Sequence, residues 1–180
     1  MKVIIAGAGQ AGTELAKKLT LDNHDVVVIE KDNQKASDIL NQLDIMVVED
    51  TGERVPNLLE AGIKDADVFI AVTDNDELNI MFCMIAKKIA NVKTVARIRN
   101  PEYSSSWMMI PSKELGIDIM IDPEKLTAIE MAKLIKSPGA SDVEFFAEGK
   151  IIFMSLKVER DSEVAGKPIS SLQLPPDSLI

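Results

Sequence analysis

The chain is poor in the residue types that build disulfide frameworks, metal clusters and catalytic dyads. Its 180 residues include one cysteine, Cys83, and one histidine, His24. A single cysteine excludes a disulfide framework and a zinc cluster, and it is typical of a protein of the reducing cytosol. The run Ile80-Met81-Phe82-Cys83-Met84-Ile85 is apolar enough to be core, so we expect a buried structural thiol.

Long apolar runs and an excess of positive charge are also missing. No run approaches the ~20 residues of a membrane-spanning helix, and residues 2–6 are too short for the apolar region of a secretory signal. The net charge of −9 argues against nucleic acid or an anionic membrane surface as the main partner. We therefore expect a soluble, cytoplasmic protein that would reach a membrane only through a partner.

Short β-branched apolar runs alternate with helical patterns along the first two thirds of the chain. This alternation is typical of βαβ units and of a parallel sheet covered by helices on both faces. We predict an α/β fold, a doubly wound parallel sheet (Rossmann fold), with ligands at the carboxyl ends of its strands where strand order reverses. The predicted strands are residues 3–6, 25–29, 45–48, 68–72, 94–98 and 117–121, and the predicted helices are 10–19, 33–43, 55–61, 76–90 and 103–115, the last broken by Pro111.

Residues 123–136 predict a helix of a different kind. Asp122-Pro123-Glu124 is a helix start signal. Apolar side chains cover most of the circumference, more than packing on one sheet face requires. Two interpretations stay open: a deeply buried terminal helix, or a helix that also packs on a second subunit. The apolar positions are Leu126, Ala128, Ile129, Met131, Ala132, Leu134 and Ile135.

The segment Gly7-Ala8-Gly9-Gln10-Ala11-Gly12 is a G-x-G-x-x-G motif between a predicted strand and a predicted helix. Gly7 permits the tight turn, Gly9 lets the backbone approach a pyrophosphate, and Gly12 allows close helix–strand packing. The helix N-terminus offers free N–H groups and its dipole to phosphates. The motif therefore predicts a nucleotide site.

Glu30 strengthens this prediction, because it lies 18 residues past Gly12 at the end of the second predicted strand. A carboxylate there can accept hydrogen bonds from both ribose hydroxyls. A 2′-phosphate about 4 Å from it would meet repulsion of ~4 kcal/mol per charge at an effective dielectric near 20. We predict a ligand with a free ribose diol, such as NAD(H), rather than NADP, although the neighbouring Lys31 would soften the penalty.

Two further stretches end predicted strands on the same rim. Thr73 and Asp74 follow the fourth strand, where an acid-rich turn is also explained as a helix cap. Arg97 and Arg99 end the fifth strand, two residues apart and so on one face. Arg97 suits phosphate binding or an intersubunit contact, and a solvated charge is the plain alternative.

Residues with the usual chemistry of catalysis are missing from this rim. His24 falls in a turn at the opposite end of the predicted sheet, where we expect it to be solvated. Tyr103 is the only tyrosine and has no lysine four residues later, as many reductases require. We predict that the chain is not an enzyme and that the nucleotide is a signal.

These motifs and several others occur together in an order that resembles the Trk potassium-uptake regulatory proteins (TrkA type), which carry a KTN/RCK nucleotide-binding domain. The resemblance is dense over residues 1–136 and weaker from Glu163 to Ile169. Besides the glycine motif it rests on Leu15-Ala16-Lys17-Lys18-Leu19, His24-Asp25-Val26, Val28-Ile29-Glu30-Lys31-Asp32, Ala61-Gly62-Ile63, Ala66-Asp67, Ile70-Ala71-Val72-Thr73-Asp74, Glu77-Leu78-Asn79 and Ala96-Arg97-Ile98-Arg99.

The resemblance implies a cytosolic regulatory subunit that binds NAD(H), or ADP or ATP, and forms homodimers or larger rings. It would gate a membrane potassium channel or transporter of the TrkH-like kind from the inner face of the cell membrane. Carried over residue by residue, Glu30 would hold the adenosine ribose, Arg97 the phosphates, and Thr73 and Asp74 would line the cleft. The phosphates would also be held by Gly7, Ala8, Gly9, Gln10 and Ala11.

The family pattern after the third strand is Gly-Asp-Gly or Gly-Asp-Ala, which the segment Glu49-Asp50-Thr51-Gly52 matches loosely. Asp50 and Thr51 are carried over as further nucleotide-binding residues.

We accordingly predict three parts: residues 1–122 as the nucleotide-binding domain, 123–139 as a dimer-crossover helix and linker, and 140–180 as the start of a small α+β C-terminal domain. Strands at 143–147 and 151–158 and a helix at 167–172 are predicted in the last part. Because roughly 40 residues are too few for a self-sufficient domain, we expect the chain to be truncated. The alternative function is an NAD-dependent oxidoreductase domain lacking its catalytic domain, and a third is an assembly module without nucleotide.

Overall fold

The apolar runs form the strands of one parallel sheet in the computed structural model, which describes all residues except 51–53, 105–110, 137–139, 147–149 and 173–177. The sheet has the order β3-β2-β1-β4-β5-β6, and every neighbouring pair is parallel. β-Branched side chains favour this arrangement because they pack well on a pleated surface. The predicted doubly wound α/β fold is confirmed. Its strands are β1 (Lys2–Ala6), β2 (Asp25–Ile29), β3 (Met46–Val48), β4 (Val68–Ala71), β5 (Lys93–Arg97) and β6 (Ile119–Ile121).

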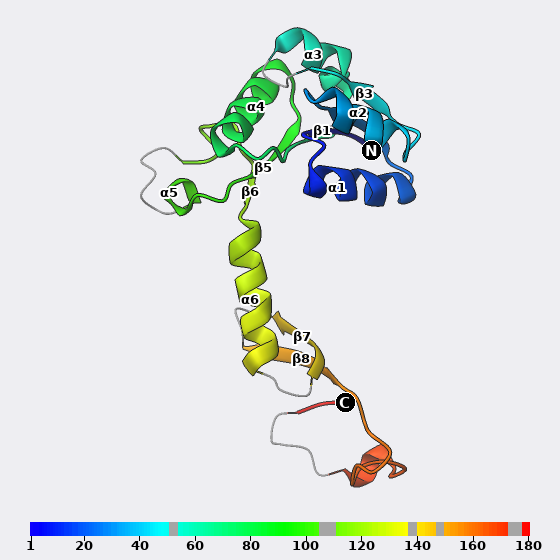
Figure 1. Ribbon diagram of the computed structural model, residues 1–180. Coiled ribbons are helices and arrows are strands. Elements are labelled where there is room, and N and C mark those ends of the chain that lie inside the picture. Colours follow the sequence, from blue (N-terminus) through cyan, green and yellow to red (C-terminus); the bar gives the residue numbers. More distant parts are fainter. Residues whose placement is uncertain (51–53, 105–110, 137–139, 147–149, 173–177) are drawn as a thin grey trace. The chain divides into compact units, whose positions relative to one another are not determined.

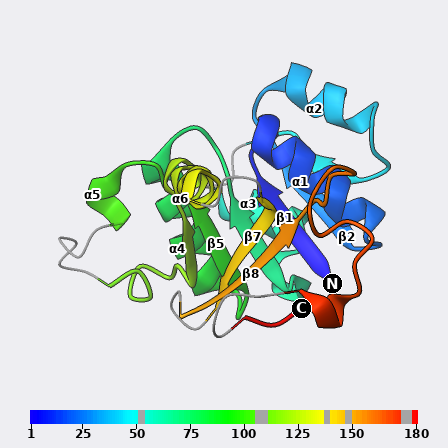
Figure 2. The ribbon, with the colours of Figure 1, turned by 90° about the horizontal axis from the view of Figure 1, so that it is seen from below.

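Helices cover both faces of this sheet (Figure 1). The helices α1 (Gln10–Leu21) and α2 (Asn33–Leu40) pack on one face, and α3 (Val55–Glu60), the short 3₁₀ helix η1 (Ile63–Asp65) and α4 (Asp76–Ile89) pack on the other. Figure 2 shows α1 beside β1 and β2, and α4 beside β5. Because side chains alternate between the two faces of a strand, burial on both faces explains the almost wholly apolar strands.

The register of the central strands brings their carboxyl ends to one edge of the sheet. Ala6, the last residue of β1, pairs with Ile29 of β2 and with Ala71 of β4. Strand order reverses here, because the chain continues from β1 to β2 on one side and reaches β4 on the other. The residues that follow these three strands therefore surround one point, which is where doubly wound folds bind ligands.

The connection between β5 and β6 differs from the helix predicted over residues 103–115. The helix α5 covers Pro101–Ser104, and residues 105–110 lie outside the described ranges. Further on, the backbone N–H groups of Glu114 and Leu115 both donate to the carbonyl of Pro111, closing a turn. Gly116 has φ +71°, a left-handed conformation that an α-helix does not contain. Helical spacing of apolar residues was misleading here, because Leu115 packs against the core from a turn.

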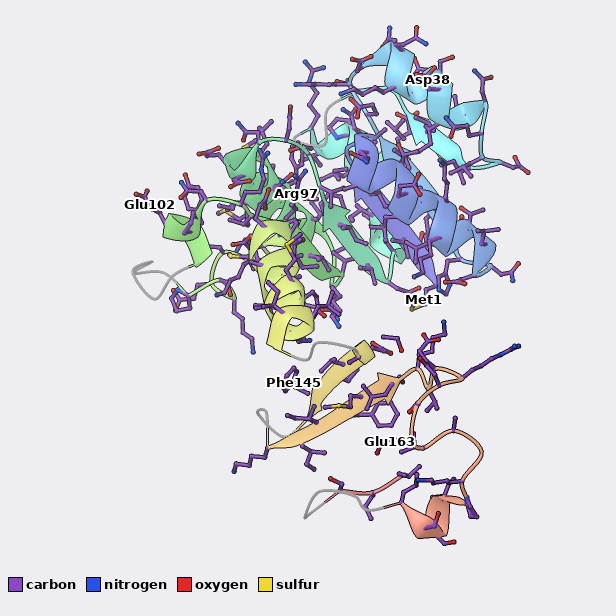
Figure 3. The ribbon with its side chains drawn as sticks, turned by 60° about the horizontal axis from the view of Figure 1, so that its bottom comes forward. Met1, Asp38, Arg97, Glu102, Phe145 and Glu163 are labelled. Carbon is purple, nitrogen blue, oxygen red and sulfur yellow. The ribbon has the colours of Figure 1, made fainter. Side chains whose placement is uncertain are left out.

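The chain after the sheet belongs mainly to a second unit, Lys125–Ile180, separate from Met1–Glu124. The helix α6 (Pro123–Lys136) has its predicted bounds, and β7 (Ala140–Phe146) pairs with β8 (Ile151–Leu156) in an antiparallel hairpin. The Nζ atom of Lys133 lies 5.8 Å from the ring centroid of Phe145. Figure 3 labels Phe145 on the hairpin. The predicted helix over 167–172 is instead the 3₁₀ turn η3 (Ile169–Ser171), which Pro168 precedes. The three-part domain division stays a prediction.

The apolar side chains of α6 are exposed. Leu126 retains 53% of its accessible surface and Ile135 retains 79%. The two interpretations of this helix, a buried terminal helix or a helix that packs on a second subunit, both stay predictions. Within the described ranges, no helix combines the length and apolar character needed to cross a membrane.

Candidate functional site

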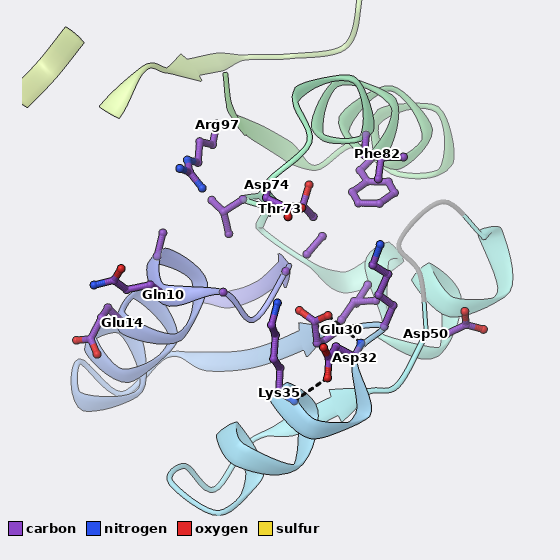
Figure 4. Close-up of a pocket in the computed structure, with 18 of the residues that line it drawn as sticks. Gln10, Glu14, Glu30, Asp32, Lys35, Asp50, Thr73, Asp74, Phe82 and Arg97 are labelled. Atoms are coloured by element: carbon purple, nitrogen blue, oxygen red, sulfur yellow. Dashed lines mark hydrogen bonds between the residues drawn. The ribbon is translucent and has the colours of Figure 1, made fainter. Parts of the chain in front are cut away.

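A cavity of about 730 Å³ opens at the carboxyl ends of the central strands (Figure 4). This volume is in the range of small-molecule pockets. Its walls come from the glycine motif and the start of α1, the end of β2 and the start of α2, and the ends of β4 and β5. The sequence-predicted residues that line it are Gly7, Gly9, Gln10, Ala11, Glu30, Asp50, Thr73, Asp74 and Arg97.

The three glycines of the motif differ in what a Cβ atom at their position would contact. Gly7 has φ +107°, and a Cβ atom built on it would lie 3.1 Å from the backbone nitrogen of Thr73. A Cβ on Gly12 would lie only 1.9 Å from the carbonyl oxygen of Gly7, so Gly12 allows helix packing and does not line the cavity. A Cβ on Gly9 would meet nothing within 4 Å. The protein itself therefore does not require glycine at this position, which faces the cavity.

The helix that starts at the glycine motif leaves its N-terminus open. No described side chain caps α1, and its first turn contains no acidic residue. In contrast, Asp32 caps α2 by accepting from the N–H groups of Gln34 and Lys35, and Asn75 caps α4. The free N–H groups and the dipole of α1 thus point at the cavity, where an anion would satisfy them.

Glu30 is fixed by the backbone on two sides. Its Oε2 atom accepts a 2.6 Å hydrogen bond from the N–H of Ala8, and its Oε1 atom accepts a 2.9 Å bond from the N–H of Asp32. The residue is 7% exposed. Each carboxylate oxygen has a further lone pair, so this geometry leaves acceptors for ligand hydroxyls. Ala8 does not line the cavity, and its backbone N–H helps to fix the carboxylate of Glu30.

Two lysines and Asp50 also line the cavity. Lys31 and Lys35 line the cavity, and Figure 4 shows Lys35 beside Glu30. Asp50 lines another part of the wall, and its Oδ2 atom is 3.5 Å from Nη1 of Arg54. Thr51, also predicted as a ligand contact, lies outside the described residues.

The two arginines at the end of β5 have different partners. Arg99 donates from Nη2 to the carbonyl of Asp74, and its Nε atom lies 3.8 Å from Oδ1 of Asp76. The Nε atom of Arg97 is buried, with no hydrogen-bond partner in the part of the chain that the structure describes. A buried, unpaired donor destabilises a protein, and a phosphate oxygen in the cavity would supply the missing acceptor.

Sequence reasoning missed a buried polar network beneath the cavity. Asn79 is fully buried and hydrogen-bonds to Thr73 and to the carbonyl of Arg97. The Oδ2 atom of Asp76 accepts from the N–H groups of Arg99 and Asn100. The sequence feature that could have revealed this network is Asn79, an amide side chain between the apolar residues Leu78 and Ile80. Lining residues outside the predicted set are Ala6, Glu14, Ile29, Lys31, Asp32, Lys35, Val72, Leu78, Phe82 and Arg99.

Cys83 is buried, as predicted, and does not line the cavity. Burial, and secondarily the negative charge of Asp118, raises the pKa of its thiol to about 12. Among the described residues, no group of three or more histidine, cysteine or acidic side chains is placed to hold a metal ion. The described side chains that line the cavity offer hydrogen-bonding groups and charges of both signs, among them Glu30, Asp74 and Arg97.

Known proteins resemble the chain in sequence. The TrkA-N domain family matches residues 3–123. A Trk system potassium uptake protein TrkA homolog of Archaeoglobus fulgidus is 38% identical over 180 residues, which cover 100% of this chain and 41% of the relative. A homolog of the same name from Pyrococcus horikoshii is 34% identical, over 100% of this chain and 79% of the relative. The chain thus spans less than half the length of the first relative and most of the second.

Solved structures share the fold. The TrkA-N domain of the inner membrane protein ybaL from Escherichia coli has a TM-score of 0.66 at 18% identity, covering 74% of this chain and 96% of that one. The GsuK channel bound to NAD has a TM-score of 0.64 at 17% identity, covering 81% and 25%. GsuK bound to ADP has a TM-score of 0.61 at 20% identity, covering 75% and 34%.

The family match extends over the whole sheet and the glycine motif, and the second relative is matched over most of its length. The chain belongs to the TrkA-N domain family, and its matched part is the Rossmann-type sheet described above.

Proposed function

We propose that the cavity binds NAD(H), with the adenosine ribose at Glu30. The observation that carries this proposal is the carboxylate of Glu30, which is buried at the end of β2 and fixed by two backbone N–H groups. A carboxylate so placed suits a ribose diol, and it would repel a 2′-phosphate.

The phosphates would lie between the glycine motif and Arg97. Three features support this placement: the open space beside Gly9, the N-terminus of α1, and the buried Nε atom of Arg97. Among the described residues, no side chain caps α1 and none accepts a hydrogen bond from this Nε atom. Each of the three features supplies a donor or the room that a pyrophosphate needs. Asp50 and Thr73 would line the rest of the cleft. ADP or ATP is the second ligand class, because structures of the same fold carry ADP as well as NAD.

The bound nucleotide would act as a signal. The chain would be the cytoplasmic regulatory part of a potassium uptake system, bound to a membrane channel or transporter at the inner face of the membrane. Nucleotide would change transport only as far as it binds one conformation of the assembly better than another. The membership in the TrkA-N family supports this role.

A second copy of the chain is the partner we propose for α6. Exposed apolar side chains surround this helix, including Leu126, Met131 and Ile135. Apolar surface of this kind is costly in water and typical of subunit interfaces.

Calorimetric titration with NAD, NADH, NADPH, ADP and ATP tests the proposed ligand. We expect micromolar binding of NAD or NADH, much weaker binding of NADPH, and no turnover of the dinucleotide. Binding of ADP or ATP alone would keep the sensing role and change its signal. Absence of binding by all five nucleotides would contradict the proposed function.

A flux assay tests the proposed regulation. The full-length protein and its membrane subunit would be reconstituted in vesicles, and potassium uptake followed with and without nucleotide. We expect nucleotide to change the uptake rate, and the change to disappear when Arg97→Ala abolishes nucleotide binding. An unchanged rate with bound nucleotide would contradict a gating role.

A further inference from the structure

Asn79 is a buried amide next to the cavity that does not itself line it. It is the fourth residue of α4 and has 0% of its surface exposed. The residues that follow on the same side of the helix, Phe82, Cys83 and Ala86, are apolar and buried in the core. An amide in such a place is destabilising unless every polar atom has a partner.

All the hydrogen-bonding capacity of this amide is used. The Oδ1 atom accepts from the N–H of Thr73 at 2.9 Å and from its Oγ1 at 2.7 Å. The Nδ2 atom donates to the carbonyl of Thr73 at 3.2 Å and to the carbonyl of Arg97 at 2.8 Å. An asparagine side chain has two donors and two acceptor lone pairs, so no capacity remains. Both partners line the cavity.

These hydrogen bonds continue the connection between the ends of β4 and β5 beyond the last residue pair of the two strands. The last residue pair between β4 and β5 is Ala71 with Ala96. Beyond it, the amide of Asn79 takes the place of a neighbouring strand by bonding both backbone groups of Thr73 and, at the same time, the end of β5. Thr73 in turn lies against the glycine motif, since a Cβ on Gly7 would be 3.2 Å from its Cα.

We infer that Asn79 is a positioning residue of the nucleotide site, which holds Thr73 and Arg97 at the spacing that the phosphate end of the ligand requires. The inference rests on the proposed function for its ligand, but the placement of the two residues is a property of the protein alone. Asn79 acts through Thr73 and Arg97 and does not touch the ligand.

The test compares Asn79→Ala with Thr94→Val. Thr94 is also fully buried, lies on β5, and donates from Oγ1 to the carbonyl of Gly116 at 2.6 Å. It precedes Arg97 by three residues and lies toward the amino end of the strand, away from the cavity. Thr94→Val therefore removes a buried hydrogen bond from the same strand without touching the proposed site.

The first readout needs no nucleotide. Amide hydrogen exchange is measured in both variants under conditions where each is folded. We expect Asn79→Ala to accelerate exchange at Thr73 and in its turn, and Thr94→Val to leave this segment unchanged. Equal protection of Thr73 in the wild type and Asn79→Ala would overturn the inference.

The second readout is binding of ADP and adenosine. We expect Asn79→Ala to weaken ADP binding at least tenfold and adenosine binding less than threefold, because Thr73 and Arg97 serve the phosphate end. Thr94→Val should change the dissociation constants of ADP and adenosine by less than twofold. Equal losses for ADP and adenosine, or no loss, would overturn the inference.

Two further outcomes are informative. If the wild type binds no nucleotide, the proposed function fails, while the exchange experiment still decides whether Asn79 holds Thr73 in place. If Asn79→Ala does not fold, Asn79→Asp replaces it. Aspartate keeps the acceptor for the N–H and Oγ1 of Thr73 and loses the donor to the carbonyls of Thr73 and Arg97. Asn79→Asp should then give the same difference between ADP and adenosine, and its absence would overturn the inference.

Discussion

The glycines of the motif show that residues of one pattern can have separate roles. Gly12→Ala would place a Cβ 1.9 Å from the carbonyl oxygen of Gly7, so either the turn or α1 must move. We expect it to lower the free energy of unfolding by about 3 kcal/mol. Gly9→Ala meets nothing within 4 Å, and we expect a change below about 1 kcal/mol together with loss of nucleotide binding.

Urea unfolding and calorimetry of the two variants separate these roles. Strong nucleotide binding by Gly9→Ala would show that the ligand does not approach this backbone. A fully stable Gly12→Ala would show that the turn has room which the structure does not reveal.

Cys83 provides a test of the core beneath the site. With a pKa of about 12, roughly one thiol in ten thousand is ionised at pH 8, and its side chain is buried. We expect no reaction with a disulfide reagent in the folded protein and one reacting thiol per chain in denaturant. Fast labelling of the folded protein would contradict the packing of α4 on the sheet.

At the level of single residues, the sequence predicted the candidate ligand contacts that lie at strand ends. These were predictable because the end of an apolar run marks the end of a strand. Glu30, Thr73 and Arg97 were found in this way, and all three line the cavity. The roles of Asn79 and Asp76 were not predicted. Their hydrogen-bond partners lie on β5 and beyond it, and the sequence does not show which residues of separate elements come into contact.

Among the elements, β2 and α6 have the bounds predicted from sequence, because an apolar run or a proline-containing start signal marks their ends. The helix predicted over 103–115 was wrong over the described residues 111–115. Its apolar spacing fitted a helix, but Pro111 accepts turn hydrogen bonds and Gly116 adopts a left-handed conformation. Periodicity alone does not reveal such a turn, whose backbone bonds depend on local conformation.

The turn before β6 is held to β5 by Asp118, which gives a pH-dependent prediction. Its Oδ2 atom accepts from Nζ of Lys87 at 2.7 Å and from the N–H of Thr94 at 2.8 Å. The bond from Lys87, followed by the one from Thr94, lowers the pKa of Asp118 below its usual 3.8. The stabilisation is therefore complete above the unfolded-state pKa and is lost as the pH falls through the lower folded-state value.

We expect Asp118→Asn to destabilise the protein at pH 6 and to reduce the loss of stability between pH 6 and pH 3. Urea unfolding of the wild type and the variant at both pH values measures this difference. The same loss of stability in both proteins would show that this carboxylate does not couple folding to pH.

For the whole molecule, the exposed apolar surface of α6 predicts self-association. We expect the chain to sediment as a dimer, at twice its mass of 19.7 kDa. Met131 and Ile135 lie one turn apart, and both are exposed. Burial of one such side chain stabilises an interface by about 1.5–3 kcal/mol, so the double variant Met131→Ser/Ile135→Ser should dissociate at micromolar concentration.

Analytical ultracentrifugation over a range of concentrations makes this comparison, with Glu124→Gln on the same helix as the matched control. A wild-type chain that stays monomeric at all concentrations would contradict the subunit interface. A dimer that survives the double variant would place the interface elsewhere.

The central claim is that Glu30 selects a ligand with a free ribose diol. The most direct measurement is the ratio of the dissociation constants for NADP and NAD, in the wild type, in Glu30→Gln and in Glu14→Gln, which removes another carboxylate that lines the cavity. Taking the ratio within each protein cancels general effects on folding. We predict at least tenfold preference for NAD in the wild type and Glu14→Gln, and a ratio near one in Glu30→Gln. An unchanged preference in Glu30→Gln, or equal binding of NADP and NAD by the wild type, would contradict the account.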